Sequence, residues 1–335
     1  MNYRVFIDAI FLSFNDKFTQ YLIAGVFCII APIANAATAS NPWTITVTPQ
    51  AYFQSYDGTT TRDNSFNVGA YVTGNYLESN TFAAGFNSTL VNLDNSASVR
   101  ESLIYVSGRH HLFLDALPGK LTLRLDYYNG SSTLEYRVNN PPTGMKKKII
   151  PGTSSTERQS TSISVIQPMV SFINYSKTFY LDLGYARSDY SRNPDATVNQ
   201  VTPTVGFGWN ESYDWLQLRA YVINLDESNG VYNKDNYNSQ EITYTHWFAD
   251  GTSPRLDFAR IAVLNGDRVL AVDPDAAVVH STGDKQTGGV AVSAQWKISE
   301  NNRVFALVSR NKYENDIAAD KYTGLLFYVN MQYHW

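Results

Sequence analysis

Charged residues recur at every second position within otherwise apolar segments of this 335-residue chain. Around Leu123 and Leu125, for example, Arg124 and Asp126 occupy the intervening positions. Alternate positions of a β-strand share one face, so these charges would gather on one side of a sheet. Charges of both signs on an aqueous surface can bind, steer or select small ions and solutes. The candidate set comprises Arg124, Asp126, Asp182, Arg219, Glu241, Lys297, Arg310 and Lys312.

Catalytic and metal-binding patterns are weak by comparison. None of the five histidines belongs to a His-Glu-x-x-His motif, and the chain has no Gly-x-Ser-x-Gly elbow. His110 and His111 are adjacent, so on a strand they point to opposite faces and cannot share one metal ion. Asp273 and Asp275 alone are weak evidence for a calcium site. We therefore expect no enzymatic activity, no metal and no cofactor.

The segments that must position these charges read as β-strands throughout the chain. Apolar and polar residues alternate in stretches of the length that crosses a bilayer as a tilted strand. The pattern predicts an all-β fold, a transmembrane antiparallel up-and-down β-barrel of about fourteen strands. A miscounted hairpin near 98–119 would make twelve or sixteen. The predicted strands are 43–56, 65–77, 81–91, 98–112, 119–133, 159–173, 177–189, 198–210, 214–226, 237–249, 254–265, 285–298, 303–313 and 322–335.

The last of these segments carries a recognisable signature. Its alternating apolar residues end on Tyr333 and on the carboxy-terminal Trp335. This resembles the closing strand of Gram-negative outer-membrane β-barrels, a superfamily rather than one family. The resemblance implies that Tyr333 and Trp335 form a signal for the barrel assembly machinery. A soluble β-sandwich or β-helix is the alternative fold.

Composition agrees with a membrane β-protein. Charged residues make up 17% and aromatics 14%, and the mean hydropathy is −0.26. Beyond the N-terminus no apolar run approaches the ~20 residues of a membrane-spanning helix. The net charge of −4 argues against nucleic acid as a partner. The one cysteine, Cys28, lies in the N-terminal apolar run, so the mature chain would hold no disulfide.

The N-terminal run is short and is followed by Ala34-Asn35-Ala36, a small-x-small cleavage pattern. We interpret residues 1–36 as a Sec signal peptide and 37–335 as the barrel domain, which predicts export to the bacterial outer membrane. An uncleaved anchor helix is the alternative.

Aromatic belts and long loops complete the prediction. All six tryptophans fall at the strand ends assigned to the periplasm, and six tyrosines (Tyr56, Tyr128, Tyr190, Tyr237, Tyr313 and Tyr322) mark the other expected girdle. The two longest loops, 134–156 and 266–284, fall on the outside, and either could narrow the mouth. The first carries Lys146, Lys147 and Lys148, a basic patch suited to lipopolysaccharide phosphates or to guiding anions.

These observations predict a porin-like channel for passive diffusion of small hydrophilic solutes or ions. A monomer is expected, with a trimer as the alternative. Two other hypotheses stay open: a barrel-only factor for surface-protein assembly or secretion, and a transporter of hydrophobic solutes. The expected partners are outer-membrane lipid and lipopolysaccharide, the barrel assembly machinery and the small hydrophilic solutes.

Overall fold

The computed structural model describes residues 42–93, 97–138, 155–191, 196–227, 234–249, 256–273, 275, 278–279, 284–315 and 319–335. The signal peptide predicted at 1–36 and the basic patch Lys146 to Lys148 lie outside these residues. Within the described part of the chain, no helix is both long and apolar enough to cross a bilayer.

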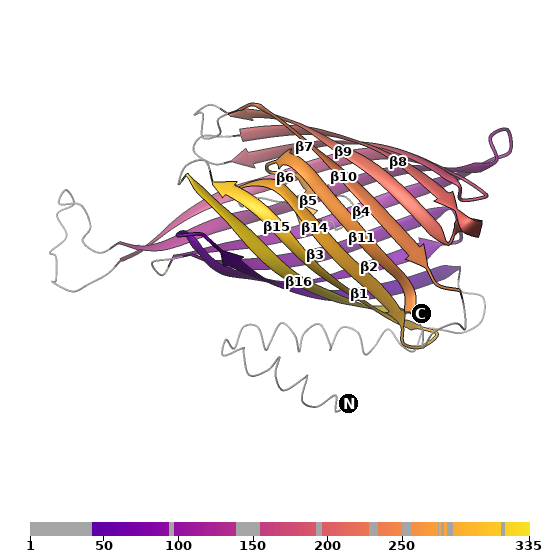
Figure 1. The fold of residues 1–335 in the computed structure, drawn as a ribbon, viewed down its shortest axis with the longest axis horizontal. Coiled ribbons are helices and arrows are strands. Elements are labelled where there is room, and N and C mark those ends of the chain that lie inside the picture. The colour runs from indigo at the N-terminus through magenta and orange to yellow at the C-terminus, as the bar shows by residue number, and fades with distance from the viewer. Residues whose placement is uncertain are drawn as a thin grey trace.

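Fourteen antiparallel strands close into one barrel, as the alternation predicts, and the first strand pairs with the last (Figure 1). Nearly every strand hydrogen-bonds the strand next to it in sequence, so the topology is up-and-down. The barrel strands are β1 (Trp43–Asp57), β2 (Arg62–Tyr76), β3 (Asn80–Leu93), β4 (Ser98–Leu114), β5 (Gly119–Val138), β6 (Ser155–Asn174), β7 (Phe179–Ser191), β8 (Ala196–Trp209), β9 (Asp214–Glu227), β10 (Asn236–Trp247), β11 (Leu256–Arg268), β14 (Lys285–Lys297), β15 (Asn302–Asn315) and β16 (Asp320–His334).

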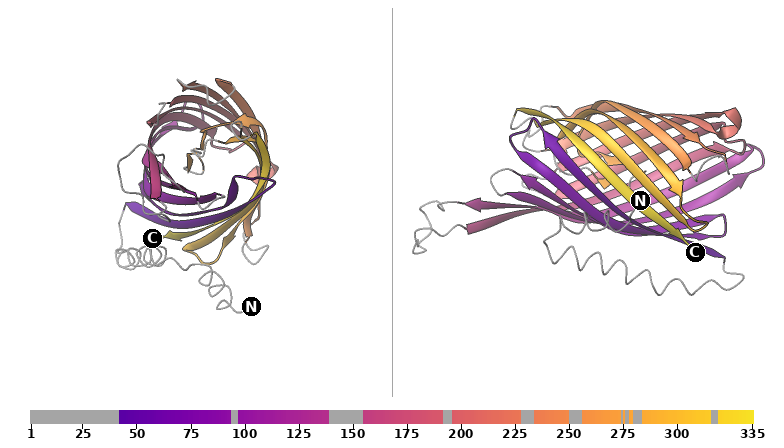
Figure 2. Two further views of the ribbon diagram at one scale, coloured as in Figure 1. Left: turned by 90° about the vertical axis from the view of Figure 1, so that its left-hand side faces the viewer. Right: turned by 60° about the horizontal axis from the view of Figure 1, so that its bottom comes forward.

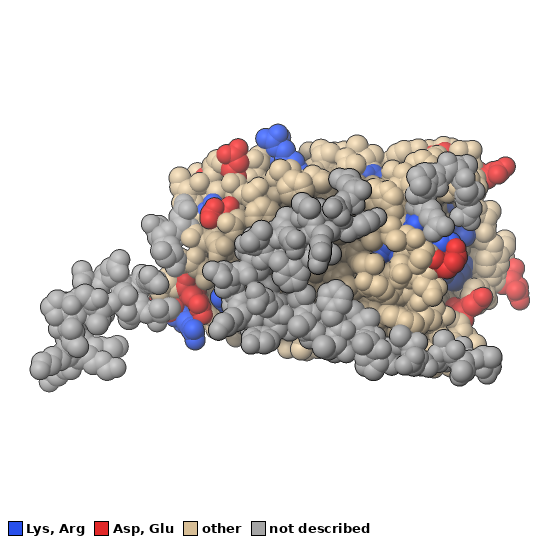
Figure 3. All heavy atoms as spheres, turned by 90° about the horizontal axis from the view of Figure 1, so that it is seen from below, with Lys and Arg blue, Asp and Glu red and all other residues tan. Residues whose placement is uncertain are grey.

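The outer face is apolar because the strands turn every second residue outward. On β5, Leu123 and Leu125 are 47% and 51% exposed, whereas Asp126 between Leu125 and Tyr127 is fully buried inside. Figure 3 shows an uncovered outer surface that is largely free of charge over its middle, with most charged residues toward the two ends. A continuous exposed apolar band around a closed barrel requires lipid, so the fold and the location are those of an outer-membrane barrel.

The two ends of the barrel differ. One end, the turn end, holds the chain's C-terminus and connections such as the 3-10 turn Asn210–Ser212. The other, the loop end, holds the long connections. All six tryptophans lie at the turn end, the end assigned to the periplasm, but Trp215 and Trp247 face the interior rather than the lipid, so the predicted belt is only partly formed. The tyrosine girdle was predicted wrongly, because Tyr128, Tyr190, Tyr237 and Tyr322 point into the barrel and are at most 5% exposed.

The first long loop starts later than the sequence pattern indicates. Strands β5 and β6 continue pairing as far as Val138 and Ser155, which gives each of them 20 residues. The paired hairpin extends beyond the rim of the barrel at the loop end (Figure 1). Its described part therefore leads away from the barrel mouth.

The second long loop folds into the barrel. After β11 the chain forms two short paired strands, β12 (Val272–Asp273) and β13 (Val278–Val279), which lie inside the ring of strands when the barrel is viewed along its axis (Figure 2). The bend begins at a register shift between Asn265 and Arg268. Gly266 lies within it at φ +97°, and a Cβ there would come within 2.5 Å of the Asn238 carbonyl oxygen. Glycine is required at such a bulge.

Candidate functional site

The inward segment, residues 269–273 with 275 and 278–279, packs against an apolar patch of the inner wall. Val269, Leu270, Ala271 and Val272 are each 1% exposed. An apolar run with this burial is stable only when it leaves water, which explains why the loop enters the barrel. The wall residues that share this apolar cluster are Leu103, Tyr105, Tyr128, Ile163, Val165, Ala186, Tyr190, Ala196, Val198, Tyr221, Ile223, Leu225, Tyr237 and Leu264.

Polar contacts hold the inward segment at successive depths. Nearest the loop end, the Tyr190 hydroxyl donates to the Leu270 carbonyl at 3.5 Å. Deeper, Gln200 Nε2 donates to the Val272 carbonyl at 2.8 Å, and the Val272 N–H donates to Gln200 Oε1 at 3.0 Å. Deepest, Arg219 pairs with the Asp275 carboxylate at 2.8 Å. The buried backbone of Val272 is thus satisfied by a side-chain amide of the wall.

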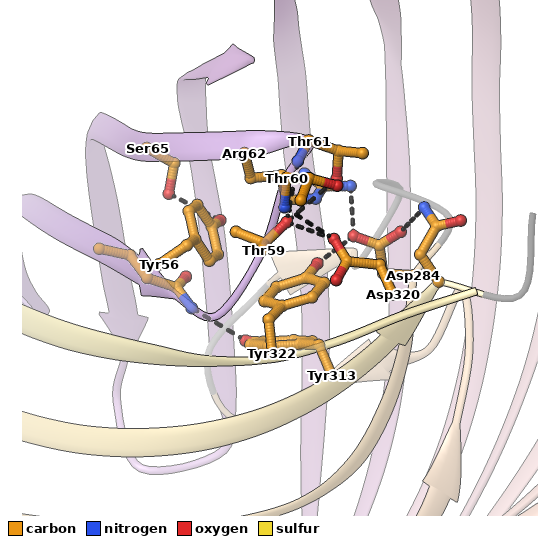
Figure 4. Close-up of polar contacts among 12 residues, drawn as sticks. Tyr56, Thr59, Thr60, Thr61, Arg62, Ser65, Asp284, Tyr313, Asp320 and Tyr322 are labelled. Carbon is orange, nitrogen blue, oxygen red and sulfur yellow. Dashed lines mark hydrogen bonds and ion pairs between the residues drawn. The ribbon is translucent and has the colours of Figure 1, made fainter. Parts of the chain in front are cut away.

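The residues that flank the inward segment, Arg268 before it and Asp284 after it, are fixed to the wall. At its start, Arg268 Nε donates to Gln286 Oε1 at 2.8 Å, and the guanidinium lies 5.2 Å from the ring centre of Tyr221. At its end, Asp284 accepts a hydrogen bond from Asn315 at 2.7 Å and also contacts Arg62 and Tyr322 (Figure 4).

The same corner of the barrel joins the first and last strands. The hydroxyl of Thr59 and the N–H of Thr60 donate to Asp320 at 2.6 and 3.1 Å, and Gln54 donates to the Tyr313 hydroxyl at 3.1 Å (Figure 4). This network therefore stabilises barrel closure and the exit of the inward segment together.

A charged layer lies on the inner wall between the inward segment and the turn end. Arg124 and Asp126, two residues apart on β5, form an ion pair at 2.6 Å. Asp182 accepts from the Tyr180 hydroxyl at 2.8 Å. Arg219 and Glu241 are direct cross-strand partners on β9 and β10. The structure thus brings five of the eight predicted charged residues to one interior layer.

A row of aromatic side chains lines the inner wall below this layer, toward the turn end. Neighbouring ring centres along the row Trp247, Phe258, Phe305 and Tyr328 are 6.3, 6.1 and 5.9 Å apart. All four side chains are only partly buried, although they face inward. Arg260, two residues from Phe258 on the inner face of β11, lies 5.2 Å above the Phe258 ring, within cation–π distance.

The three remaining predicted charges have different positions. Lys297 lies on the inner face of β14 close to the turn end and pairs with Glu300 at 3.1 Å. Arg310 and Lys312 do not line the interior. Arg310 is exposed on β15 beside the buried Ser309, and its direct cross-strand neighbours are the outward Val290 and Leu325, 47% and 40% exposed. Lys312 lies two residues further along the same outer face.

The predicted C-terminal signal residues complete the barrel. The N–H of Trp335 donates to the carbonyl of Ile45 at 2.9 Å, and the N–H of Ile45 donates back at 3.1 Å. The rings of Tyr333 and Trp335 are stacked 6.1 Å apart. The last residue is therefore part of the seam with β1, whereas recognition by the assembly machinery stays a prediction.

Several interior residues were not singled out from the sequence as a site. Asp275 was considered for calcium alone, and Gln200, Arg260 and the aromatic row were not named as functional. One sequence signal existed: Val269-Leu270-Ala271-Val272 interrupts a loop assigned to the outside. Four consecutive apolar residues are unexpected in a solvated loop, and they indicate insertion into the barrel.

The fold defines the class: a closed fourteen-stranded outer-membrane barrel whose interior holds an inserted hairpin. No protein-family model matches the chain, and no curated protein sequence matches it. In fold it is similar to the toluene transporter TbuX of Ralstonia pickettii, with a TM-score of 0.54 at 10% identity over 88% of this chain and 90% of that one. It is also similar to the toluene transporter TodX of Pseudomonas putida, with a TM-score of 0.53 at 10% identity over 91% and 92%.

Proposed function

We propose that this protein is an outer-membrane channel for small apolar solutes, with compact aromatic molecules as the favoured class. The observation that carries the proposal is the aromatic row Trp247, Phe258, Phe305 and Tyr328, which faces the interior and stays partly accessible. A barrel wall that faces water has no reason to present such a row, whereas apolar ligand sites are lined by aromatic side chains.

The inward segment, whose strands β12 and β13 form the inserted hairpin, also supports an apolar solute. It buries Val269 to Val272 against the apolar part of the wall and so occupies interior space that a hydrophilic porin leaves to water. The similarity in fold to two toluene transporters agrees with an apolar solute. The charged layer favours the porin-like channel predicted from the sequence, but this is the less well supported of the two functions.

Binding of toluene by the full chain refolded in lipid nanodiscs tests the proposal. We expect saturable binding above the partition into empty nanodiscs, measured by saturation-transfer NMR. Replacing the inner Phe305 by alanine should weaken it about fivefold, the typical worth of an aromatic contact. The matched control is Phe327→Ala, because Phe327 is 49% exposed on the outer face of the neighbouring strand. Equal loss in both variants, or no saturable binding, would contradict the proposal.

Conductance separates the two functions. An apolar channel with an inserted hairpin should show no stable ohmic steps in a planar bilayer, whereas an open hydrophilic porin should show them in every insertion. Large constant steps from the folded wild type would favour the hydrophilic porin and would count against the apolar channel.

A further inference from the structure

The strongest unexplained feature of the interior is the pairing of Arg219 with a residue that is not part of the wall. The Arg219 side chain is only 4% exposed on β9, and its Nε donates to Thr204 at 3.1 Å. Its ion-pair partner, Asp275, comes from the inserted hairpin. Among the residues that the structure describes, no other carboxylate lies within ion-pair distance of this guanidinium.

The two partners differ in accessibility. The Asp275 side chain is 61% exposed although the hairpin reaches deep into the barrel, so the carboxylate borders open interior space. Asp275 is placed by its own chain, since its N–H donates to Asp273 at 3.1 Å at the turn between β12 and β13. A solute that reaches the interior can therefore approach the position that this carboxylate holds.

Other arginines surround the same position. Withdrawal from bulk water into the barrel would raise the pKa of Asp275, but Arg219, Arg124 and Arg260 together hold this pKa below its usual value. Arg260 Nε donates to Thr245 at 3.1 Å, and within the described ranges this arginine has no carboxylate at ion-pair distance. The position thus attracts negative charge from three strands of the wall, β5, β9 and β11.

Withdrawal of the hairpin would leave Arg219 without its anion. Because Asp275 is largely exposed, separating this pair costs less than breaking a fully buried one, but it still leaves the buried Arg219 guanidinium without its carboxylate. A movement of the hairpin away from the wall therefore becomes feasible when another anion takes the place of Asp275. Solute binding and displacement of the hairpin would then be coupled through one guanidinium.

We propose that Arg219 is the centre of an anion-binding site whose solute carries a carboxylate on a compact apolar body. In the absence of this solute, the carboxylate of Asp275 occupies the site. We infer a carboxylate on the solute because Asp275, the group that Arg219 now binds, is itself a carboxylate. The apolar body rests on the proposed function and on the neighbouring wall, where Leu264 lies directly across from Glu241 and Tyr221 lies two residues from Arg219.

Competition between the tethered and the free carboxylate gives the test. The probes are benzoate and toluene, which share a ring and differ in the charged group, titrated against the full chain in nanodiscs. Asp275→Asn removes the competitor, so benzoate should bind about tenfold more tightly if Asp275 occupies the site nine-tenths of the time. Toluene affinity should change by less than about twofold, since no charge is involved. Asp275→Asn with Arg219→Gln should lose the gain.

The control for net charge is Asp57→Asn, which removes one negative charge from an exposed position at the end of β1 and should leave benzoate binding unchanged. Weaker or unchanged benzoate binding in Asp275→Asn would overturn the anion site. So would a gain that survives Arg219→Gln. Saturable toluene binding without any benzoate response would overturn this inference alone, whereas the benzoate response without saturable toluene binding would overturn the proposed function alone.

Discussion

Two ion pairs on the inner wall contain the same groups and differ in what carries the carboxylate. Arg124 and Asp126 are two residues apart on one strand, so the pair persists as long as β5 does, and Asp126 is fully buried. Arg219 is equally part of the wall, but Asp275 is brought to it by a hairpin and is mostly exposed. The first pair is a fixed part of the barrel. The second can separate without unfolding it.

Removing each carboxylate in turn should lower the free energy of unfolding by very different amounts in the two pairs, and this is the largest effect that we expect. Asp126→Asn removes the negative charge to which the largely buried Arg124 guanidinium now makes bonds of 2.9 and 2.6 Å. We expect it to lower the free energy of unfolding by about 3 kcal/mol, at the low end for broken buried pairs. Asp275→Asn should cost about 1 kcal/mol or less, because an exposed partner contributes little.

Urea titration of both variants in lipid vesicles measures this difference. Double variants with Arg124→Gln and Arg219→Gln show whether each effect runs through its arginine, since a coupled pair is non-additive. If Asp275→Asn destabilises the barrel as much as Asp126→Asn does, the hairpin is an integral part of the fold and the contrast between the two pairs disappears.

Two buried glutamines extend the comparison to uncharged groups. Gln200 is 1% exposed and makes two hydrogen bonds to the backbone of Val272. Gln200→Leu would leave the N–H and the carbonyl of Val272 unsatisfied and should lower the free energy of opening at this position by about 2 kcal/mol. The Val272 N–H should then exchange with solvent about thirtyfold faster, which hydrogen–deuterium exchange measures.

The matched control is Gln167→Leu. Gln167 is also fully buried on the inner wall, but in the described structure neither atom of its side-chain amide has a hydrogen-bond partner. Replacing it by leucine should leave Val272 exchange unchanged and be neutral or stabilising overall. Equal acceleration in the two variants would mean that wall packing, rather than the Gln200 contact, holds the hairpin.

The pattern of alternation was sufficient to predict the barrel, its strand number and the position of every barrel strand to within a few residues. It was sufficient because a bilayer forces one face of each strand to be apolar. The same argument fails for the interior. Nothing in the period of two says whether an inward side chain meets water, another strand or a returning loop, and four of the six tyrosines assigned to the second girdle belong inside for that reason.

Strand β15 shows the limit within one element. Its two faces each mix apolar and polar residues, Val304, Ala306, Val308 and Arg310 on one and Phe305, Leu307 and Ser309 on the other, so the sequence alone does not decide which face is outward. Pairing with β14 and β16 decides it, because Val308 is opposite Phe327, which is 49% exposed to lipid. Arg310 lies on the same face of β15 as Val308 and therefore points outward.

Arg310 is thus a lipid-facing arginine that can be compared with the two inner arginines, Arg124 and Arg219. Its replacement should change the free energy of unfolding least. Lipid-facing arginine costs free energy at the bilayer centre and about 0–1 kcal/mol near the interface, and Arg310 lies toward the loop end of its strand. Arg310→Leu should raise the free energy of unfolding by about 1 kcal/mol or less in vesicles of neutral lipid. Urea titration measures it beside Arg124→Leu, which should be strongly destabilising because Asp126 stays buried without a cation. A loss in Arg310→Leu as large as that in Arg124→Leu would place Arg310 in the interior after all.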